Sequence, residues 1–389
     1  MRLAIVASHP VQYYAPLFRN LAWRLDLTVF FAHRAGAEDQ ARAGFGVGFQ
    51  WDVDLLEGFD HAFLANVSRQ PGVDAFSGCD IPEIGQRLSK GRFDAVMVMG
   101  WRLKSDIQAV LAARRLGLPL LARGDSQLAS PRSPLKRLAK SLAYPPLLRA
   151  FNAALYVGRR SRDYWRHYRY PADRLFFSPH CIDTDWFAAR ATAQARRDLR
   201  ERLGIAPERP AVLFAGKLLP FKRPLDLIAA VERLGQGGLG VAVIVAGAGP
   251  LEVEMAAAAG ARGVEYHPLG FRNQSEMPAA YAAADVLALP SDGRETWGLV
   301  ANEALACGRP IVISEEAGAA PDLAEDGAVG RTFKVGDIAG LAEALRTVLS
   351  RPPPAEAIAA RSAAYSLTAA SDGIEEALEQ TRRRRYGIG

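Results

Sequence analysis

Short apolar segments alternate with longer helical patterns along the chain, and this alternation restricts the fold more than any other feature of the sequence. In the first half, Tyr14–Arg24 and Asp106–Leu116 have helical patterns. The segments of strand character are Leu3–Ala7, Leu27–Phe31, Ala95–Met99, Pro119–Ala122 and Ala154–Val157. Strands separated by helices in this way predict parallel sheets covered by helices on both faces.

The alternation begins again after Pro207–Pro210, which predicts a second sheet in tandem with the first. Between the two sets of strands, residues 182–209 form a charged, helical stretch without strand character. The later strand segments are Ala211–Ala215, Val241–Ala246, Val264–His267, Val286–Leu289 and Pro310–Ile313. Open parallel sheets bind ligands at the carboxyl ends of their strands. Two facing sheets therefore predict a ligand cleft between two domains.

Composition excludes several classes of protein. The chain is 49% hydrophobic and 23% charged, which is ordinary for a globular protein. Its 389 residues are too many for one average domain. No apolar run approaches the roughly 20 residues that span a bilayer. Cys79, Cys181 and Cys307 are scattered and have no metal-binding spacing, so we expect buried thiols in a reducing, cytoplasmic setting.

Positive charge is concentrated in the first half. Residues 1–205 contain 30 Lys and Arg against 19 Asp and Glu, whereas residues 206–389 contain 18 against 23. A basic half favours anionic partners such as phosphorylated substrates or acidic lipid surfaces. No nucleic-acid-binding motif accompanies the charge, so nucleic acid is not a predicted partner.

The segment Pro290–Gly308 carries the strongest chemical signal. A predicted strand ends at Leu289, a turn follows, and a helix is expected to begin near Trp297–Gly298. The unpaired N–H groups at a helix start favour an anion such as a diphosphate, and Gly298 lets a ligand approach the main chain. Glu295 before the helix and Glu303 about one and a half turns inside it suit the hydroxyl groups of a sugar. The alternative to ligand binding is that Glu295 only caps the helix and Glu303 is a solvated glutamate on its surface.

Three further turns follow predicted strands. After Gly216, Lys217 and Lys222 bracket a short turn where two cations can clamp a diphosphate, although loop lysines are often merely exposed. Gly247–Pro250 is a plain turn signal. Gly270 and Phe271 can offer backbone groups and an aromatic edge to a base.

Taken in this order, these segments resemble the retaining glycosyltransferases of family 4, most strongly over residues 210–330. The resemblance implies the α/β GT-B fold, in which two Rossmann-like domains have parallel sheets facing a central cleft. It implies an acceptor-binding domain over residues 1–187 and a nucleotide-sugar-binding domain over residues 188–365. A crossover helix within residues 366–389 would pack back on the first domain.

The resemblance also implies roles for individual residues. Lys217 and Lys222 match the pair that holds the donor diphosphate, next to Gly216. Glu295 matches the carboxylate that orients the donor sugar, and Glu303 the one that binds the ribose hydroxyls. The base would lie near Gly270 and Phe271. The main chain that contacts phosphate and sugar would be that of Trp297, Gly298, Leu299 and Val300.

The first domain departs from the family pattern. The family's frequent histidine after a later strand is missing, and Arg123 and Asp125 stand in its place. With His9 and Gln12 they are the candidates for the acceptor side of the cleft. The alternatives are that His9 has only a structural role and that Arg123 and Asp125 form an ion pair within their loop.

The implied reaction is transfer of a sugar, with retention, from a nucleotide diphosphate sugar to a glycan, lipid-linked or small-molecule acceptor. Uridine is the expected base, and neither a cofactor nor a metal ion is predicted. Neither Asp-x-Asp triplet, Asp52–Asp54 or Asp183–Asp185, is assigned a metal. A non-catalytic nucleotide-sugar-binding protein, and an epimerase or phosphorylase of similar architecture, are the competing hypotheses.

The segment Pro131–Phe151 places basic residues among leucines. If Leu135, Leu138 and Leu142 share a face, the segment is a basic amphipathic helix suited to peripheral contact with the inner, anionic membrane surface. The alternative is a helix packed on the first domain with a solvated basic face.

Overall fold

The computed structural model describes residues 1–41, 44, 46–129 and 132–387, and contains two parallel sheets. The first sheet has the strand order β3-β2-β1-β4-β5-β6-β7. Its strands are β1 Arg2–Ala7, β2 Asp26–Phe31, β3 Asp60–Phe63, β4 Ala95–Val98, β5 Leu120–Gly124, β6 Ala153–Tyr156 and β7 Leu175–Phe177. In register, Ile5 of β1 lies beside Val29 of β2 and Met97 of β4. The predicted strands of this half are confirmed to within two residues at either end.

The second sheet has the order β10-β9-β8-β11-β12-β13. Its strands are β8 Ala211–Ala215, β9 Ala242–Ala246, β10 Tyr266–Gly270, β11 Val286–Leu289, β12 Ile311–Ser314 and β13 Gly330–Phe333. The predicted strand Val264–His267 is wrong at both ends, because β10 begins two residues later and ends three residues later. β13, which the sequence did not predict, pairs with β12 at the edge of the sheet.

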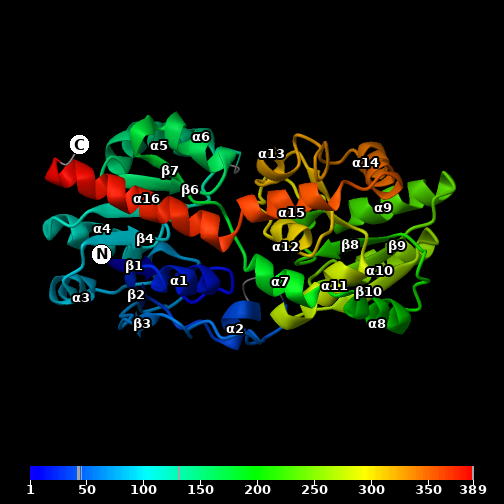
Figure 1. The fold of residues 1–389 in the computed structure, drawn as a ribbon, viewed down its shortest axis with the longest axis horizontal. Helices are drawn as coiled ribbons and strands as arrows, with labels where there is room; N and C mark the ends of the chain where they lie inside the picture. Colours follow the sequence, from blue (N-terminus) through cyan, green and yellow to red (C-terminus); the bar gives the residue numbers. More distant parts are fainter. Residues whose placement is uncertain (42–43, 45, 130–131, 388–389) are drawn as a thin grey trace.

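Helices cover both faces of each sheet, as the strand–helix alternation predicts (Figure 1). The first sheet carries α1 Ala15–Ala22, α3 Ile84–Gly91, α4 Lys104–Arg115, α5 Pro134–Leu148 and α6 Arg159–His167, with the short α2 Ala37–Gln40 nearby. The second carries α7 Thr184–Arg190, α8 Ala193–Leu203, α9 Pro224–Gln236, α10 Glu252–Ala261, α11 Met277–Ala283, α12 Val300–Ala306, α13 Ala320–Leu323, α14 Ile338–Ser350 and α15 Ala355–Ala364. In β1, Leu3 and Ile5 face one core cluster while Ala4 faces the other, which is the period of two that a strand requires.

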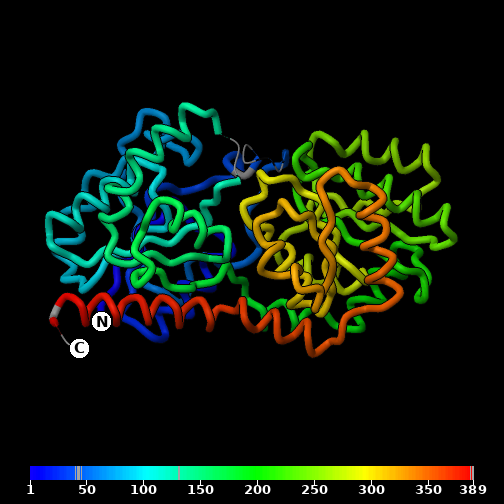
Figure 2. Tube along the Cα trace, turned by 90° about the horizontal axis from the view of Figure 1, so that it is seen from above, coloured from blue at the N-terminus to red at the C-terminus, as the bar shows by residue number. Residues whose placement is uncertain are grey.

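The last helix, α16 Leu367–Tyr386, returns to the first sheet (Figure 2). It packs against α1, β6 and β7, and Ile374 lies in the same core cluster as Leu17. A Cβ atom at Gly373 would lie 1.8 Å from the carbonyl oxygen of Phe177, so this close approach requires glycine. The boundaries 1–187, 188–365 and 366–389 stay predictions, and Ile182 and Phe187 pack in the core of the second sheet.

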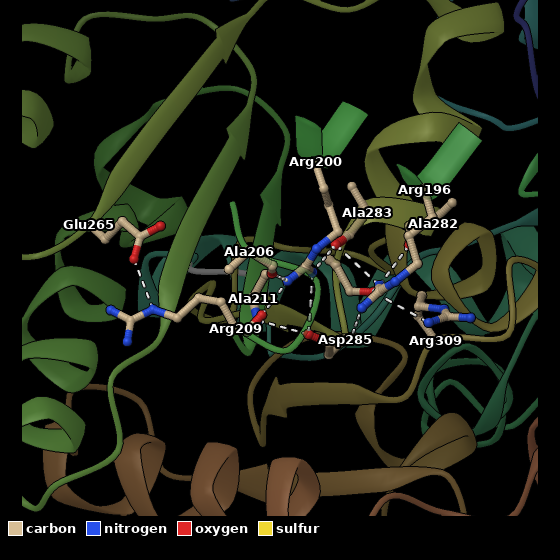
Figure 3. A network of polar contacts seen from close by, with 11 residues as sticks. Arg196, Arg200, Ala206, Arg209, Ala211, Glu265, Ala282, Ala283, Asp285 and Arg309 are labelled. Atoms are coloured by element: carbon tan, nitrogen blue, oxygen red, sulfur yellow. Dashed lines mark hydrogen bonds and ion pairs between the residues drawn. The ribbon is translucent and has the colours of Figure 1, made fainter. Parts of the chain in front are cut away.

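A network of arginines fastens α8 to the amino-terminal ends of the second sheet's strands (Figure 3). Arg196 donates to Asp285 at 2.7 Å, and Asp285 in turn accepts from the backbone N–H of Ala211 at 2.8 Å. Arg200 donates to the carbonyl oxygen of Ala283 at 2.8 Å. These contacts occupy the amino edge of the sheet and leave its carboxyl edge to the cleft.

Two further observations concern membrane-spanning helices and the cysteines. Across the part of the chain that is described, no helix combines the length and the hydropathy needed to cross a membrane. Cys79, Cys181 and Cys307 are free and buried, in agreement with the expectation of buried thiols.

Candidate functional site

A cleft of about 470 Å³ lies at the carboxyl ends of β8, β9, β10 and β11. It is lined by residues of the second half of the chain and by Gln12 and Trp51 of the first half. The sequence-predicted residues that line it are Gln12, Gly216, Lys217, Lys222, Phe271, Glu295, Val300 and Glu303. The two lysines and two glutamates singled out by the sequence therefore share one cavity.

The turn after β8 holds the two lysines. Gly216 has φ +134, and its N–H donates to the carbonyl oxygen of Ala246 at 2.9 Å, which joins this turn to the end of β9. Burial lowers the pKa of Lys217, the charge of Lys222 acts in the same direction, and Glu295 opposes both. Lys222 forms an ion pair with Glu295, and both side chains are only 12–13% exposed. An anion that enters here meets two cations and one carboxylate.

The turn after β11 holds Glu295. Its side chain accepts a hydrogen bond of 3.1 Å from the Ser291 hydroxyl, and its carbonyl oxygen accepts from the N–H of Gly318 at 3.0 Å. Gly318 is required there because a Cβ atom would lie 1.8 Å from the carbonyl oxygen of Thr296. The turn is thus fixed against the segment that follows β12.

The helix after this turn begins later than predicted. α12 starts at Val300, not near Trp297–Gly298, because Gly298 has φ +99, a conformation outside the helical region. Glu303 consequently lies in the first turn of α12 rather than one and a half turns inside it. A Cβ atom at Gly298 would lie 2.5 Å from Leu289 Cδ2, so both its φ and its surroundings favour glycine.

Glu303 is paired with a tyrosine of the neighbouring helix. The Tyr281 hydroxyl donates to Glu303 Oε2 at 2.6 Å. Burial raises the pKa of Glu303 from 4.5 to about 7, although the hydrogen bond from Tyr281 works against this shift. Its carboxyl group therefore changes charge close to neutral pH.

Four predicted donor-side residues are not among the described residues that line the cleft: Gly270, Trp297, Gly298 and Leu299. Gly270 ends β10, and its carbonyl oxygen accepts from the N–H of Gly247 at 2.8 Å. The Trp297 side chain is 4% exposed and donates through Nε1 to Asn302 Oδ1 at 2.8 Å. Its indole ring thus packs in the core, and the expected contact of its main chain with phosphate and sugar stays a prediction.

The predicted acceptor-side residues fall in different places. Gln12 lines the cleft. His9 is absent from the described lining; it contacts the Ser8 hydroxyl at 2.9 Å, and burial, reinforced by His33, lowers its pKa to about 4. Arg123 does not face the cleft as expected, because its guanidinium is buried and donates to the carbonyl oxygen of Pro179 at 2.6 Å.

Asp125 lies at the contact between the two halves. It accepts a hydrogen bond of 2.7 Å from Thr296 Oγ1, and His180 Nε2 lies 3.9 Å away. Burial opposes ionisation of Asp125, but the contacts with His180 and Thr296 outweigh it and lower its pKa to about 2. The alternative ion pair of Asp125 with Arg123 is not formed, since Arg123 is directed to Ser178 and Pro179.

Several residues of the site carried no clear signal in the sequence. Trp51, Phe221, Arg272, Gln274 and Met277 also line the cleft. Gln127 donates through Nε2 to the carbonyl oxygens of Gly293 and Glu295, both at 3.2 Å. Gln127 lies two residues after Asp125, just beyond the end of β5, and this position is the signal from which its role in the site could have been predicted.

The acidic triplets take part in structural contacts, one between the two halves of the chain and one local. Asp52 accepts from the N–H of Ser275 at 3.2 Å, and Asp183 caps α7 by accepting from the N–H of Trp186 at 3.0 Å. Within residues 1–41, 44, 46–129 and 132–387, no group of three or more His, Cys, Asp or Glu side chains is arranged to hold a metal ion.

Comparison with solved structures defines the class of the fold. The structure of Anabaena Alr3699/HepE in complex with UDP has a TM-score of 0.73 and 18% sequence identity, and the match covers 98% of this chain and 100% of that one. With two parallel sheets around a cleft, the chain has the α/β GT-B fold.

The family match is more specific. Residues 195–365 match the family described as glycosyl transferases group 1.

Two curated relatives extend the likeness. A GDP-mannose-dependent alpha-(1-6)-phosphatidylinositol monomannoside mannosyltransferase of Mycolicibacterium smegmatis is 33% identical over 211 residues, 52% of this chain and 54% of the relative. A D-inositol 3-phosphate glycosyltransferase of Xylanimonas cellulosilytica is 33% identical over 244 residues, 59% of this chain and 57% of the relative. The chain thus spans about half the length of these relatives.

Proposed function

We propose that this protein is a glycosyltransferase that moves a sugar, with retention at the anomeric carbon, from a nucleoside diphosphate sugar to a hydroxyl group. The acceptor is a glycan, a lipid-linked glycan or a small molecule. The observation that most supports this is one cleft of about 470 Å³ lined by two lysines and two glutamates, namely Lys217, Lys222, Glu295 and Glu303.

The proposed roles follow from charge and position. Lys217 and Lys222 hold the diphosphate, and a diphosphate that engages Lys222 frees Glu295 to accept hydrogen bonds from the donor sugar. Glu303 accepts those of the ribose. Gln12 lines the same cleft from the first half of the chain and belongs to the acceptor side.

The proposed transfer occurs on one face of the sugar. The bond between the anomeric carbon and the diphosphate oxygen breaks as the bond to the acceptor oxygen forms, and the acceptor's proton passes to the departing diphosphate. The protein orients the two reactants and stabilises the negative charge that grows on the leaving group. The lysines supply that positive charge, so the proposed step uses no metal ion.

The proposal does not yet specify whether the donor nucleotide is UDP or GDP. Uridine is the sequence-based expectation, one relative is GDP-mannose-dependent by name, and the Anabaena structure holds UDP. Purified protein should therefore be incubated with UDP- and GDP-sugars and a panel of glycan, lipid-linked and small acceptors. Release of the nucleoside diphosphate with a product of the donor's anomeric configuration, read by NMR, is the expected result. Donor binding without transfer to any acceptor would instead indicate a non-catalytic nucleotide-sugar-binding protein.

A further inference from the structure

Helix α5 presents a stripe of leucines to solvent. Leu135, Leu138 and Leu142 are 76%, 59% and 72% exposed, and their spacing of three and four residues places them on one face of the helix. Ser130 and the predicted start of this segment, Pro131, lie outside the described residues. In Figure 1 the helix lies beside α6 at the outer edge of the first half.

The opposite face of α5 holds the helix to the protein. Lys140 donates to the Tyr164 hydroxyl at 3.3 Å, and its ammonium lies 4.4 Å from the ring centre of Tyr144. The Tyr144 ring packs against that of Tyr168 at 5.1 Å, and Leu148 is fully buried. Packing on the first domain therefore accounts for this face of α5. It does not explain why the opposite face exposes three leucines.

The surroundings of the stripe are basic. No Asp or Glu occurs in residues 126–162, whereas this segment contains eight Lys and Arg. Lys136 and Arg137 of α5 are exposed next to the leucines. A second copy of this chain would bring like charges together on this face, whereas an anionic lipid surface complements it and accepts the leucines among its acyl chains.

We propose that α5 docks on a bilayer containing anionic phospholipid, with Leu135, Leu138 and Leu142 inserted at the interface and Lys136 and Arg137 at the headgroups. The segment before α5 contains Gln127, which donates to the carbonyl oxygen of Glu295, a residue of the cleft lining. This inference does not depend on the proposed sugar transfer, because the surface exists whatever the cleft binds.

Vesicle flotation tests the proposal with the full chain. We expect binding to vesicles of phosphatidylglycerol and phosphatidylcholine, weak binding to phosphatidylcholine alone, and a decrease as salt rises from 0.05 to 0.5 M. Substitution of all three leucines by serine should abolish flotation. The pair K136E and R137E should weaken binding by roughly 30-fold or more, since each cation near such a surface contributes about fivefold.

Matched controls separate docking from general stickiness. Trp23, Leu111 and Val253 are exposed apolar residues on other helices or their ends, and their substitution by serine should leave flotation unchanged. Lys90→Glu with Arg115→Glu makes the same charge change on α3 and α4. Because all these side chains are exposed, each variant should keep the melting temperature of the parent.

Three outcomes would overturn the proposal. They are no flotation with anionic vesicles, flotation that is insensitive to the leucine and charge variants, and concentration-dependent self-association that the leucine variants abolish without any vesicle binding.

Discussion

The Thr296 hydroxyl donates a hydrogen bond of 2.7 Å to Asp125, and this contact joins the two halves of the chain beside the cleft. Thr296 follows Glu295 directly, and Gln127, two residues beyond Asp125, donates to the carbonyl oxygen of Glu295. The position of Glu295 therefore depends on a loop of the other domain. Residues far apart in the sequence together form the donor side of the proposed site.

Removal of Gln127 should loosen the turn that carries Glu295. We expect Gln127→Ala to raise the KM for the donor by roughly 3- to 10-fold, with a smaller change in kcat, because the two lost hydrogen bonds of about 1 kcal/mol each hold the turn and only part of their free energy affects donor binding. Steady-state kinetics with varied donor measures this split. Gln70→Ala, on an exposed loop, is the matched control, and an unchanged KM in Gln127→Ala would argue against a positioning role.

Loss of one diphosphate-holding lysine should slow transfer strongly. Lys222→Ala is expected to reduce turnover by roughly 100-fold, because a preorganised charge no longer stabilises the departing diphosphate. The exposed Lys334→Ala serves as control, and thermal denaturation verifies that both variants fold. Transfer by Lys222→Ala at the parental rate would exclude this role for Lys222.

Glu303 should make stability depend on pH. Its pKa is raised to about 7 in the folded protein, so between its ordinary 4.5 and 7 the folded state keeps a proton that the unfolded state releases. The free energy of unfolding therefore falls as pH rises through this range, by at most about 3 kcal/mol from this group.

The variant Glu303→Gln removes this titration. Urea denaturation at pH 5 and pH 8 should show a smaller loss of stability in Glu303→Gln than in the parent, whereas exposed Glu356→Gln should behave as the parent does. The same loss in all three proteins would mean that Glu303 titrates normally.

The bend before α12 should require Gly298. At φ +99, with a Cβ atom 2.5 Å from Leu289, alanine is strained, so Gly298→Ala should lower the free energy of unfolding by about 1–3 kcal/mol. Gly260 in α10 has open space around it, and Gly260→Ala should raise stability by up to about 1 kcal/mol. Equal effects at the two positions in urea denaturation would contradict this account.

The sequence predicted the parts of the site that follow strands of the second sheet. Lys217 and Glu295 lie in the turns that follow the buried apolar strands β8 and β11, and parallel strands bring such turns to one edge. The start of α12 was misplaced because Gly298 has φ +99, outside the helical region, which no local sequence pattern reveals.

Contacts between the halves were the least predictable. The ring centroids of Phe49 and Phe271 lie 4.2 Å apart, and Asn273 donates to the carbonyl oxygen of Gln50 at 2.7 Å, yet these segments lie more than 200 residues apart. Arg123 was expected in the cleft, but the alternation of β5 directs its side chain into the protein, where Ser178 and Pro179 bind it. Such placements follow from how the two sheets meet.

Isothermal titration calorimetry with UDP and GDP tests the central claim most directly, because it measures whether this cleft binds a nucleoside diphosphate. The account predicts saturable binding of at least one of them by the parent and the Lys334→Ala protein, and loss of most affinity when Lys217 and Lys222 are both changed to alanine in a protein that still folds. Undiminished affinity in the double variant, or no binding of either nucleotide by the parent, would contradict it.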